Sequence, residues 1–242
     1  MKIGIIGFGR LGKLITKYLA QDFEVLVYDI IDQSKDVEKL RAKPATLQEV
    51  CSCDAVIPFV PISAFETCIK EIAPLLKEDA LVIDVCSVKE TPVEIMNKYL
   101  PHHIQILATH PMFGPDSAKD TLFGSKIVIS KIRIQEELYA RIISYLKTNG
   151  LKVVEVTPEE HDRQIAKSLN LAHLVGRVLI DFKATPQEID TKGYRRLLKI
   201  LETVENDSWQ LFKDMNKYNR FAKQTTNDFK DCLSKVLQRL ED

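Results

Sequence analysis

The sequence predicts an α/β domain built on a parallel β-sheet, followed by a smaller all-α domain. Three observations predict this arrangement. Short apolar runs alternate with helical patterns up to residue 156, a glycine-rich turn follows the first run, and we find no strand-like run beyond Thr157. Alternation of strands and helices is typical of a parallel sheet covered by helices. We expect the first domain to span residues 1–156 and the second to span residues 157–242.

Seven short apolar runs are expected to form the strands of the sheet. Several are nearly continuous in Ile, Val and Leu, as strands buried on both faces require. The runs are Lys2–Ile6, Glu24–Tyr28, Ala55–Phe59, Leu81–Val85, Gln105–Ala108, Lys126–Ser130 and Val153–Val156. Helical periodicity occurs between them at Leu11–Ala20, Ala64–Leu76 and Ile134–Thr148.

The pattern changes at Thr157. Thr157-Pro158-Glu159-Glu160 has the form of a helix capping box with proline at the first helical position. One long buried helix is expected to follow, because apolar or small residues recur with helical spacing at Ile165, Leu169, Ala172, Val175, Leu179 and Phe182. Further helices are expected at Tyr194–Glu205, Asp207–Lys217 and Thr226–Leu240. A helical domain this small often completes its core against a second subunit, so we expect a homodimer formed through it.

The composition excludes several function classes. The 242 residues include 34 Lys+Arg and 34 Asp+Glu, and this balance argues against nucleic-acid binding and against a polybasic membrane binder. We find no signal-peptide pattern and no apolar stretch near the ~20 residues that span a bilayer. The five cysteines are scattered, so we expect free thiols in a reducing cytoplasm and no metal site. These features favour a cytoplasmic protein that acts on a small molecule.

A glycine-rich turn connects the first strand to the first helix. Gly7-Phe8-Gly9-Arg10-Leu11-Gly12 is a GxGxxG pattern. In this context the first glycine makes a tight turn, the second lets a pyrophosphate approach the backbone, and the third lets helix and strand pack closely. The phosphates then lie at the helix N-terminus. We therefore interpret the first domain as a Rossmann-type dinucleotide-binding domain, with all six residues in contact with the cofactor.

Two further segments indicate where the rest of the cofactor binds. Asp29 ends the second strand, 17 residues after Gly12, and a carboxylate there can accept hydrogen bonds from a ribose hydroxyl and would repel a 2′-phosphate. No Arg follows it until Arg41, so NAD is favoured over NADP; a surface Asp in a turn is the alternative. Pro61 and Ser63 follow the third strand, where a nicotinamide would lie.

Two loops carry candidate catalytic groups. Asp84–Glu90 follows one strand and Thr109–Pro115 follows the next, so both loops should open at the carboxyl edge of the sheet, where ligands bind. His110, with a hydroxyl nearby at Ser87, is suited to taking a proton from a substrate alcohol, because the unperturbed pKa of histidine lies near neutrality. A structural histidine before Pro111 is the alternative interpretation.

The chain resembles the prephenate/arogenate dehydrogenase family of tyrosine biosynthesis over nearly its whole length. The resemblance depends on the glycine loop, Asp84–Lys89 (DxxSVK), His110–Pro115 (HPMFGP), Glu160–Arg163, Ala172-His173 and Gly176–Leu179. Three segments look most like plant-type arogenate dehydrogenases: Pro115–Asp120, Thr191–Tyr194 and Asn206–Ser208.

The resemblance implies oxidative decarboxylation of prephenate or arogenate, with hydride transfer to NAD(P). The family's histidine matches His110 and withdraws the proton of the ring hydroxyl, while the serine that matches Ser87 hydrogen-bonds that hydroxyl. The family's helix histidine, which matches His173, helps to bind substrate. We expect Lys89 to contact the substrate as well. His161 and Asp162 match the family too, but a capping or interdomain role is expected for both.

Some features depart from the family pattern. Many bacterial relatives bind a substrate carboxylate with Arg in a Thr-Arg-Ile-Ala segment, which this chain lacks. The nearest cations in this chain are Arg195 and Arg196, followed by Lys199. The sequence supports two interpretations of them equally, a site for the substrate carboxylate and a basic face exposed to solvent. Asp29 departs from the NADP-dependent plant-type relatives. The chain ends soon after the helical domain, so we expect no regulatory domain.

Two alternative functions are compatible with a dinucleotide-binding domain followed by a helical domain. One is an NAD-dependent reductase or 3-hydroxyacid dehydrogenase of the same two-domain plan, which leaves the SVK and HPMFGP segments unexplained. The other is a non-catalytic nucleotide-binding regulator, which has no chemical need for His110 and Ser87 together. Prephenate and arogenate both remain open as the substrate.

Overall fold

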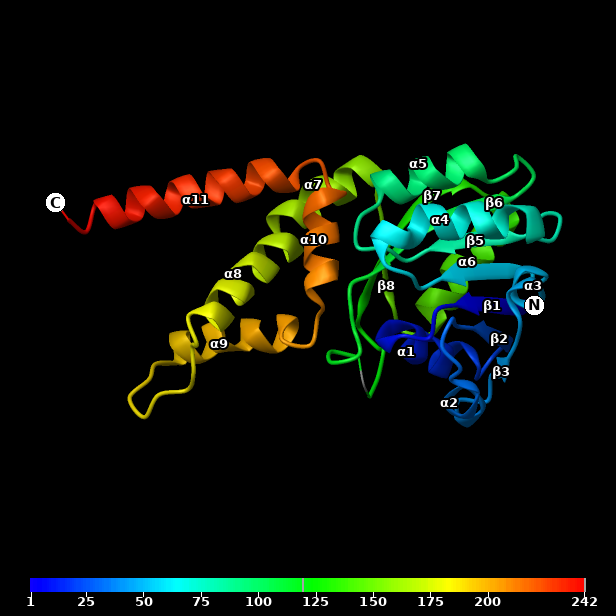
Figure 1. The fold of residues 1–242 in the computed structure, drawn as a ribbon, viewed down its shortest axis with the longest axis horizontal. Helices are drawn as coiled ribbons and strands as arrows, with labels where there is room; N and C mark the ends of the chain where they lie inside the picture. Colours follow the sequence, from blue (N-terminus) through cyan, green and yellow to red (C-terminus); the bar gives the residue numbers. More distant parts are fainter. Residues whose placement is uncertain (119, 242) are drawn as a thin grey trace. The chain divides into compact units, whose positions relative to one another are not determined.

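The computed structural model describes residues 1–118 and 120–241 (Figure 1). The chain divides into two compact units, unit 1 (Met1–Pro158) and unit 2 (Glu159–Asp242). Among the described residues, no helix combines the length and the apolar character needed to cross a membrane.

Unit 1 is built on one eight-stranded sheet with the order β3-β2-β1-β4-β5-β6-β7-β8 (Figure 1). The strands are β1 (Lys2–Ile6), β2 (Glu24–Tyr28), β3 (Lys43–Pro44), β4 (Ala55–Pro58), β5 (Leu81–Asp84), β6 (Gln105–Pro111), β7 (Lys126–Arg133) and β8 (Lys152–Glu155). The first six follow the order of a Rossmann fold, which reverses between β1 and β4. The predicted α/β class with a Rossmann-type sheet is therefore confirmed, and all seven predicted strands are present.

One strand pair departs from the predicted parallel sheet, so the observed sheet is mixed. β7 pairs with β6 in the antiparallel direction, whereas the other pairs are parallel. A parallel connection needs a crossover, usually a helix. The described residues between β6 and β7 form turns and loops without a helix, so the chain returns along the same edge. The two-residue strand β3 was not predicted, because so short an edge strand has no apolar pattern.

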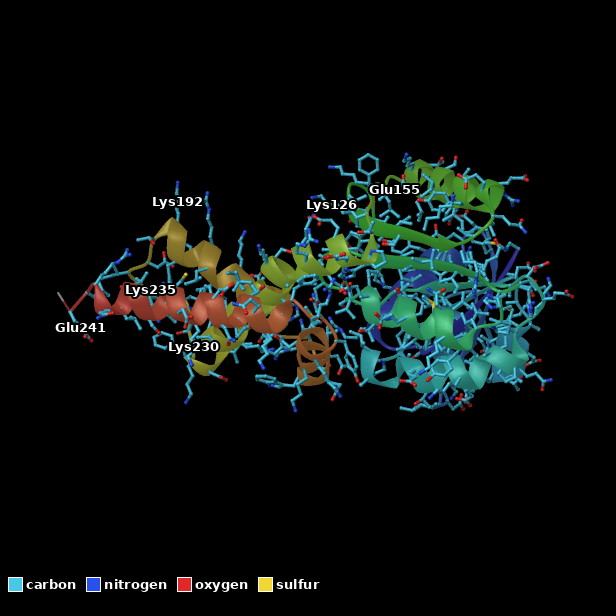
Figure 2. The ribbon with its side chains drawn as sticks, turned by 90° about the horizontal axis from the view of Figure 1, so that it is seen from above. Lys126, Glu155, Lys192, Lys230, Lys235 and Glu241 are labelled. Atoms are coloured by element: carbon cyan, nitrogen blue, oxygen red, sulfur yellow. The ribbon has the colours of Figure 1, made fainter. Side chains whose placement is uncertain are left out.

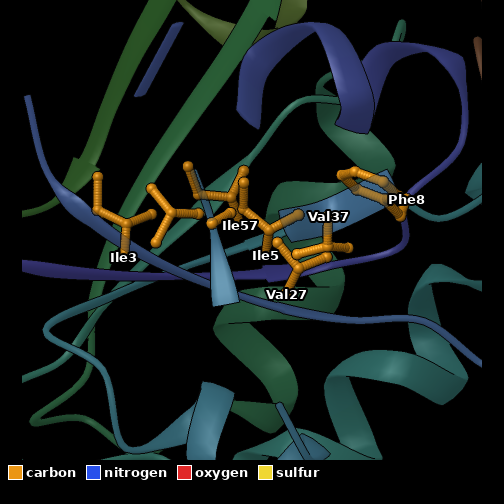
Figure 3. Packing of buried hydrophobic residues seen from close by; sticks show 8 residues of the cluster. Ile3, Ile5, Phe8, Val27, Val37 and Ile57 are labelled. Atoms are coloured by element: carbon orange, nitrogen blue, oxygen red, sulfur yellow. The ribbon is translucent and has the colours of Figure 1, made fainter. Parts of the chain in front are cut away.

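Helices cover both sides of this sheet. They are α1 (Arg10–Leu19), α2 (Ser34–Lys39), α3 (Leu47–Cys51), α4 (Ile62–Ile72) with the 3-10 turn Ala73–Leu75, α5 (Glu90–Tyr99) and α6 (Glu136–Thr148). Figure 3 shows one part of the core, where Ile5 and Val27 from neighbouring strands pack against Val37 of α2 and against Phe8. Phe8 is fully buried, so the turn after β1 is anchored in the core.

Unit 2 contains α7 (Pro158–Lys167), α8 (Leu169–Asp181), α9 (Lys192–Val204), α10 (Trp209–Lys217) and α11 (Ala222–Gln238). The predicted single helix after Thr157 is two helices, because the chain leaves helical geometry at Ser168 (φ −114°, ψ −85°). The Ser168 hydroxyl donates to the Gln164 carbonyl at 2.7 Å, a bond that competes with the helix ladder. α8 packs against α9, α10 and α11. Charged side chains such as Lys192, Lys230 and Lys235 extend from α9 and α11 (Figure 2).

Candidate active site

The carboxyl ends of five neighbouring strands carry the residues that the sequence predicts for cofactor and catalysis. Backbone hydrogen bonds hold the ends of β1, β2 and β4 together. Gly7 N–H donates to the Tyr28 carbonyl at 2.8 Å, and Phe59 N–H donates to the Ile6 carbonyl at 2.6 Å. Pro61 and Ser63 follow β4 at the start of α4, and both are exposed. Ligands of open α/β sheets bind outside this edge.

The glycine turn has the shape that a dinucleotide pyrophosphate requires. Gly7 has φ +95°, and a Cβ there would lie 2.4 Å from the Phe59 carbonyl oxygen. A Cβ at Gly12 would lie 2.4 Å from the Gly7 carbonyl oxygen, whereas a Cβ at Gly9 meets no atom within 4 Å. Gly9 is also the N-cap of α1, with no side-chain cap and no acidic residue in the first turn. The N-terminus of α1, with its positive dipole end, therefore suits an anionic ligand.

Asp29 is fixed against this turn. Its Oδ2 accepts the Phe8 N–H at 2.5 Å, and its Oδ1 accepts the Ile31 N–H at 2.8 Å. Each carboxylate oxygen keeps a further lone pair for a ribose hydroxyl. Phe8 therefore takes part through its backbone, because its side chain is fully buried in the core.

An ion pair that the sequence did not reveal connects the glycine turn to the HPMFGP loop. Arg10 Nη2 donates to both carboxylate oxygens of Asp116, at 2.7 and 2.8 Å. Tyr18 Oη also donates to the Ala118 carbonyl at 3.3 Å. No spacing rule links residues that are 106 positions apart in the chain. The segment that begins after His110 is thus attached to α1 at two points.

The two candidate catalytic residues lie at adjacent strand ends. β5 and β6 are parallel neighbours with Asp84 opposite Ala108. Ser87 follows β5 in a half-buried loop, and His110, near the end of β6, is only 5% exposed. The Thr109 hydroxyl donates to the Asp84 carbonyl at 2.7 Å, which joins the two strand ends directly beside His110.

Lys89 lies inside unit 1. Its side chain is fully buried, and Nζ donates to Asp84 Oδ2 and, at 2.6 Å, to the Thr109 carbonyl. Burial raises the pKa of the Asp84 carboxyl, and the Lys89 ammonium opposes that rise. This position argues against the predicted substrate contact of Lys89, because a fully buried ammonium that donates to internal partners does not reach a substrate. It instead holds the Ser87 loop to the strand end that carries His110.

Within unit 2, His173 is buried on α8. Its ring stacks on Phe212 (centroids 6.3 Å apart), and Nε2 lies 3.6 Å from Asp207 Oδ2. Nδ1 is buried and has no hydrogen-bond partner among the residues that the structure describes. Burial lowers the pKa of His173, an effect that Asp207 opposes and Arg177 reinforces. This shift favours the neutral form of the imidazole.

The other residues that the sequence singled out in unit 2 fall into two groups. Arg195 and Arg196 are exposed on α9, and Arg195 Nε pairs with Asp190 at 2.9 Å. His161 and Asp162 are buried on α7, where His161 Nδ1 and Asp162 Oδ1 are 2.7 Å apart. Asn219 Nδ2 donates to the Asp162 carbonyl at 2.8 Å, which connects α7 to the turn before α11.

A family model matches more than half of the chain. The model, described as the nucleotide-binding domain of prephenate dehydrogenase, covers residues 16–171. The chain belongs to the prephenate dehydrogenase family. A second model, described as a TYRAAT1-like C-terminal domain, matches residues 178–242.

Two curated relatives of this family come from Arabidopsis thaliana. Chloroplastic arogenate dehydrogenase 2 is 33% identical over 90% of this chain and 64% of its own length. Chloroplastic arogenate dehydrogenase 1 is 34% identical over 95% of this chain and 37% of its own length. The chain therefore spans less than two thirds of these plant relatives.

Two solved structures have the same fold. Synechocystis arogenate dehydrogenase aligns over 100% of this chain and 92% of its own, with a TM-score of 0.74 and 22% identity. The prephenate dehydrogenase from A. aeolicus, in complex with hydroxyphenyl propionate and NAD+, aligns over 100% and 92% with a TM-score of 0.76 and 20% identity. At these sequence identities, the structural similarity establishes the fold and not the function.

Proposed function

We propose that this chain catalyses the oxidative decarboxylation of prephenate or arogenate, with hydride transfer to a nicotinamide dinucleotide. The observation that carries the proposal is the position of His110 and Ser87. They lie at the carboxyl ends of adjacent parallel strands, at the sheet edge where the glycine turn lies, in a chain of the prephenate dehydrogenase family. The names of the plant relatives and the geometry of the glycine turn support it further.

The proposed reaction transfers one proton and one hydride from the substrate. His110 takes the proton of the ring hydroxyl as the hydroxyl-bearing carbon becomes a carbonyl, and Ser87 orients that hydroxyl. A bound nicotinamide would supply the acceptor for the hydride of the same carbon. The C–C bond to the ring carboxylate then breaks, and its electron pair moves into the ring as CO2 leaves. The new phenolic oxygen recovers the proton, and the product is tyrosine or 4-hydroxyphenylpyruvate.

The residues of unit 1 have complementary roles in this proposal. The glycine turn and the first turn of α1 bind the pyrophosphate, Asp29 binds the ribose, and Pro61 with Ser63 lie beside the nicotinamide. The Lys89–Asp84 pair positions the loop of Ser87. In unit 2, we assign His173 to substrate binding. Catalysis then depends mainly on orientation and on one proton transfer.

The preferred cofactor is NAD, and Asp29→Ser tests this assignment. The carboxylate would repel a 2′-phosphate, whereas serine leaves room for one. We expect the variant to shift the ratio of kcat/KM values for NAD and NADP toward NADP by about tenfold or more, equivalent to ~1.4 kcal/mol. Steady-state kinetics with both cofactors measures the ratio, and an unchanged ratio would refute the role of Asp29. Asp32→Ser, in the exposed turn that follows, is the matched control.

The active form is a homodimer formed through unit 2. Large apolar side chains are exposed on two of its helices: Val178 (58%) on α8 and Leu233 (50%), Val236 (53%) and Leu237 (53%) on α11. Apolar stripes of this kind typically mark interaction sites. Light scattering should give twice the chain mass of 27.6 kDa, and Leu233→Glu should reduce it to one chain. Lys235→Glu, on the opposite side of α11, should stay dimeric. A wild-type mass that corresponds to one chain at every concentration would contradict the dimer.

The proposed activity is tested by cofactor reduction. The purified chain is incubated with prephenate or with arogenate, each with NAD or NADP, and the reduced cofactor is followed by absorbance. We expect NAD reduction with at least one of the two substrates. Reduction with simple 3-hydroxyacids in place of both would favour the alternative dehydrogenase class.

A further inference from the structure

Unit 1 contains an apolar cleft on one face of its sheet. The cleft has a volume of about 890 Å³, and all the residues that line it belong to unit 1. Residues of α1 and α6 form its walls, and strand residues form its floor. The floor includes Ile3, Ala55, Ile57, Leu81, Ile83 and Leu107. A volume in this range is typical of sites for organic ligands.

The central strand β5 shows how open this face of the sheet is. β5 lies between β4 and β6. Val82 and Asp84 on its other face are fully buried, whereas Ile83 and the following Val85 line the cleft and are only half-buried. Apolar side chains in the middle of a sheet are normally covered, because burial gains about 25 cal/mol per Å² of apolar surface. A ligand in the cleft would gain this free energy.

The cleft lies on the opposite face of the sheet from the candidate catalytic histidine. Successive side chains of a strand point to opposite faces. Leu107, Thr109 and Pro111 of β6 line the cleft, so the intervening His110 belongs to the other face. The cleft is therefore separate from the site proposed for catalysis.

Arg141 places a cation at the rim of the cleft. It is exposed on α6, one helical turn before Tyr145, and both residues line the cleft. Among the described residues, the Arg141 guanidinium has no ion pair and no hydrogen bond. The nearby carboxylate of Asp22 accepts the Tyr145 hydroxyl at 2.7 Å, and the Tyr145 ring packs edge-on against Phe23. The rim thus combines fixed aromatic rings with an available guanidinium, whose planar fork fits a carboxylate.

We propose that this cleft binds an organic carboxylate with a large apolar body. The body lies on the sheet face at Ile83 and Val85, and the carboxylate pairs with Arg141. The apolar lining disfavours a polar ligand, because burying polar groups without hydrogen bonds is costly. Arg141 selects an anion over a neutral apolar molecule. Most of the affinity comes from the apolar body, since an ion pair exposed to water contributes little. The proposal is independent of the proposed function.

Fluorescence of anilinonaphthalene sulfonate tests the site, because this anion has a large apolar body and emits strongly in apolar surroundings. Decanoate, naphthoate and decanol are the competitors. We expect at least one of the two carboxylates to displace the probe, and decanol to displace it about fivefold more weakly than decanoate if the linear acid binds. Displacement by decanoate alone identifies a linear ligand, and displacement by naphthoate alone identifies a ring system. Displacement by neither carboxylate would overturn the proposal.

Variants locate the bound probe. Arg141→Met should weaken binding about fivefold, which is the upper range for an exposed ion pair. Lys147→Met, exposed on the same helix outside the cleft, should leave binding unchanged. Val85→Phe places a ring on the floor of the cleft and should weaken binding tenfold or more. If Val85→Phe fails to fold, Arg141→Met still decides, because Arg141 is exposed and its replacement leaves the core intact.

Three results would overturn the proposal. The first is probe binding that is unchanged in Arg141→Met and in Val85→Phe. The second is binding that Leu233→Glu removes and Val85→Phe does not, which would place the probe on the apolar side chains of α11. The third is binding that appears only when the protein is diluted below its dimer concentration, which would assign the cleft to a second copy of the chain.

Discussion

Replacing His110 with Asn is expected to lower kcat by about two orders of magnitude or more, with the affinity for NAD unchanged. General acid–base catalysis by a positioned side chain typically contributes 10²- to 10⁴-fold. Asn has a similar size and can still hydrogen-bond a hydroxyl, but it cannot accept the proton. The measurement is steady-state turnover combined with a fluorescence titration of NADH, which separates the chemical step from cofactor binding.

The control for this variant is His103→Asn. His103 is exposed in the turn before β6, so the same substitution there should leave turnover within twofold. Turnover of His110→Asn near the wild-type value would remove His110 from the mechanism. Equal losses of turnover and of NADH affinity would instead point to a damaged sheet edge.

Replacing Lys89 with Met is expected to have the largest effect on stability. The ammonium is fully buried against Asp84, and Met fills a similar volume but leaves a buried carboxylate without its cation. Removing one partner of a buried pair typically costs about 3–5 kcal/mol. Urea denaturation followed by circular dichroism measures the free energy of unfolding. Lys35→Met, at an exposed position of α2, should change it by less than ~0.5 kcal/mol.

A second substitution tests the cause of this loss. Asp84→Asn, added to Lys89→Met, removes the unpaired charge and keeps an acceptor for the Cys86 N–H, which now donates to Asp84 at 2.7 Å. The double variant should therefore be more stable than Lys89→Met alone. Additive losses would show that Lys89 acts through packing and not through charge.

Much of the fold could be predicted from the sequence, because buried parallel strands have a simple pattern. Apolar runs such as Glu24–Tyr28 match β2 residue for residue. The direction of β7 could not be predicted in this way, since it depends on a connection without a helix. The break at Ser168 was also hidden, because a serine that bonds to a carbonyl one turn earlier keeps the apolar spacing of its helix intact.

The sequence also predicts one part of the candidate site and not the rest. Residues at strand ends, such as Asp29 and His110, could be identified because topology brings all carboxyl ends of parallel strands to one edge. The full burial of Lys89 and its pairing with Asp84 could not, because both are properties of the packed chain.

The central claim is that hydride transfer and decarboxylation occur together on a cyclohexadiene substrate. The most direct test incubates the protein with NAD and prephenate or arogenate labelled at the ring carboxylate, and measures labelled CO2 together with NADH. We predict equal amounts of both, with tyrosine or 4-hydroxyphenylpyruvate as the organic product, and a parallel loss of both in His110→Asn. NADH without labelled CO2, or no NADH from either substrate, would contradict the claim.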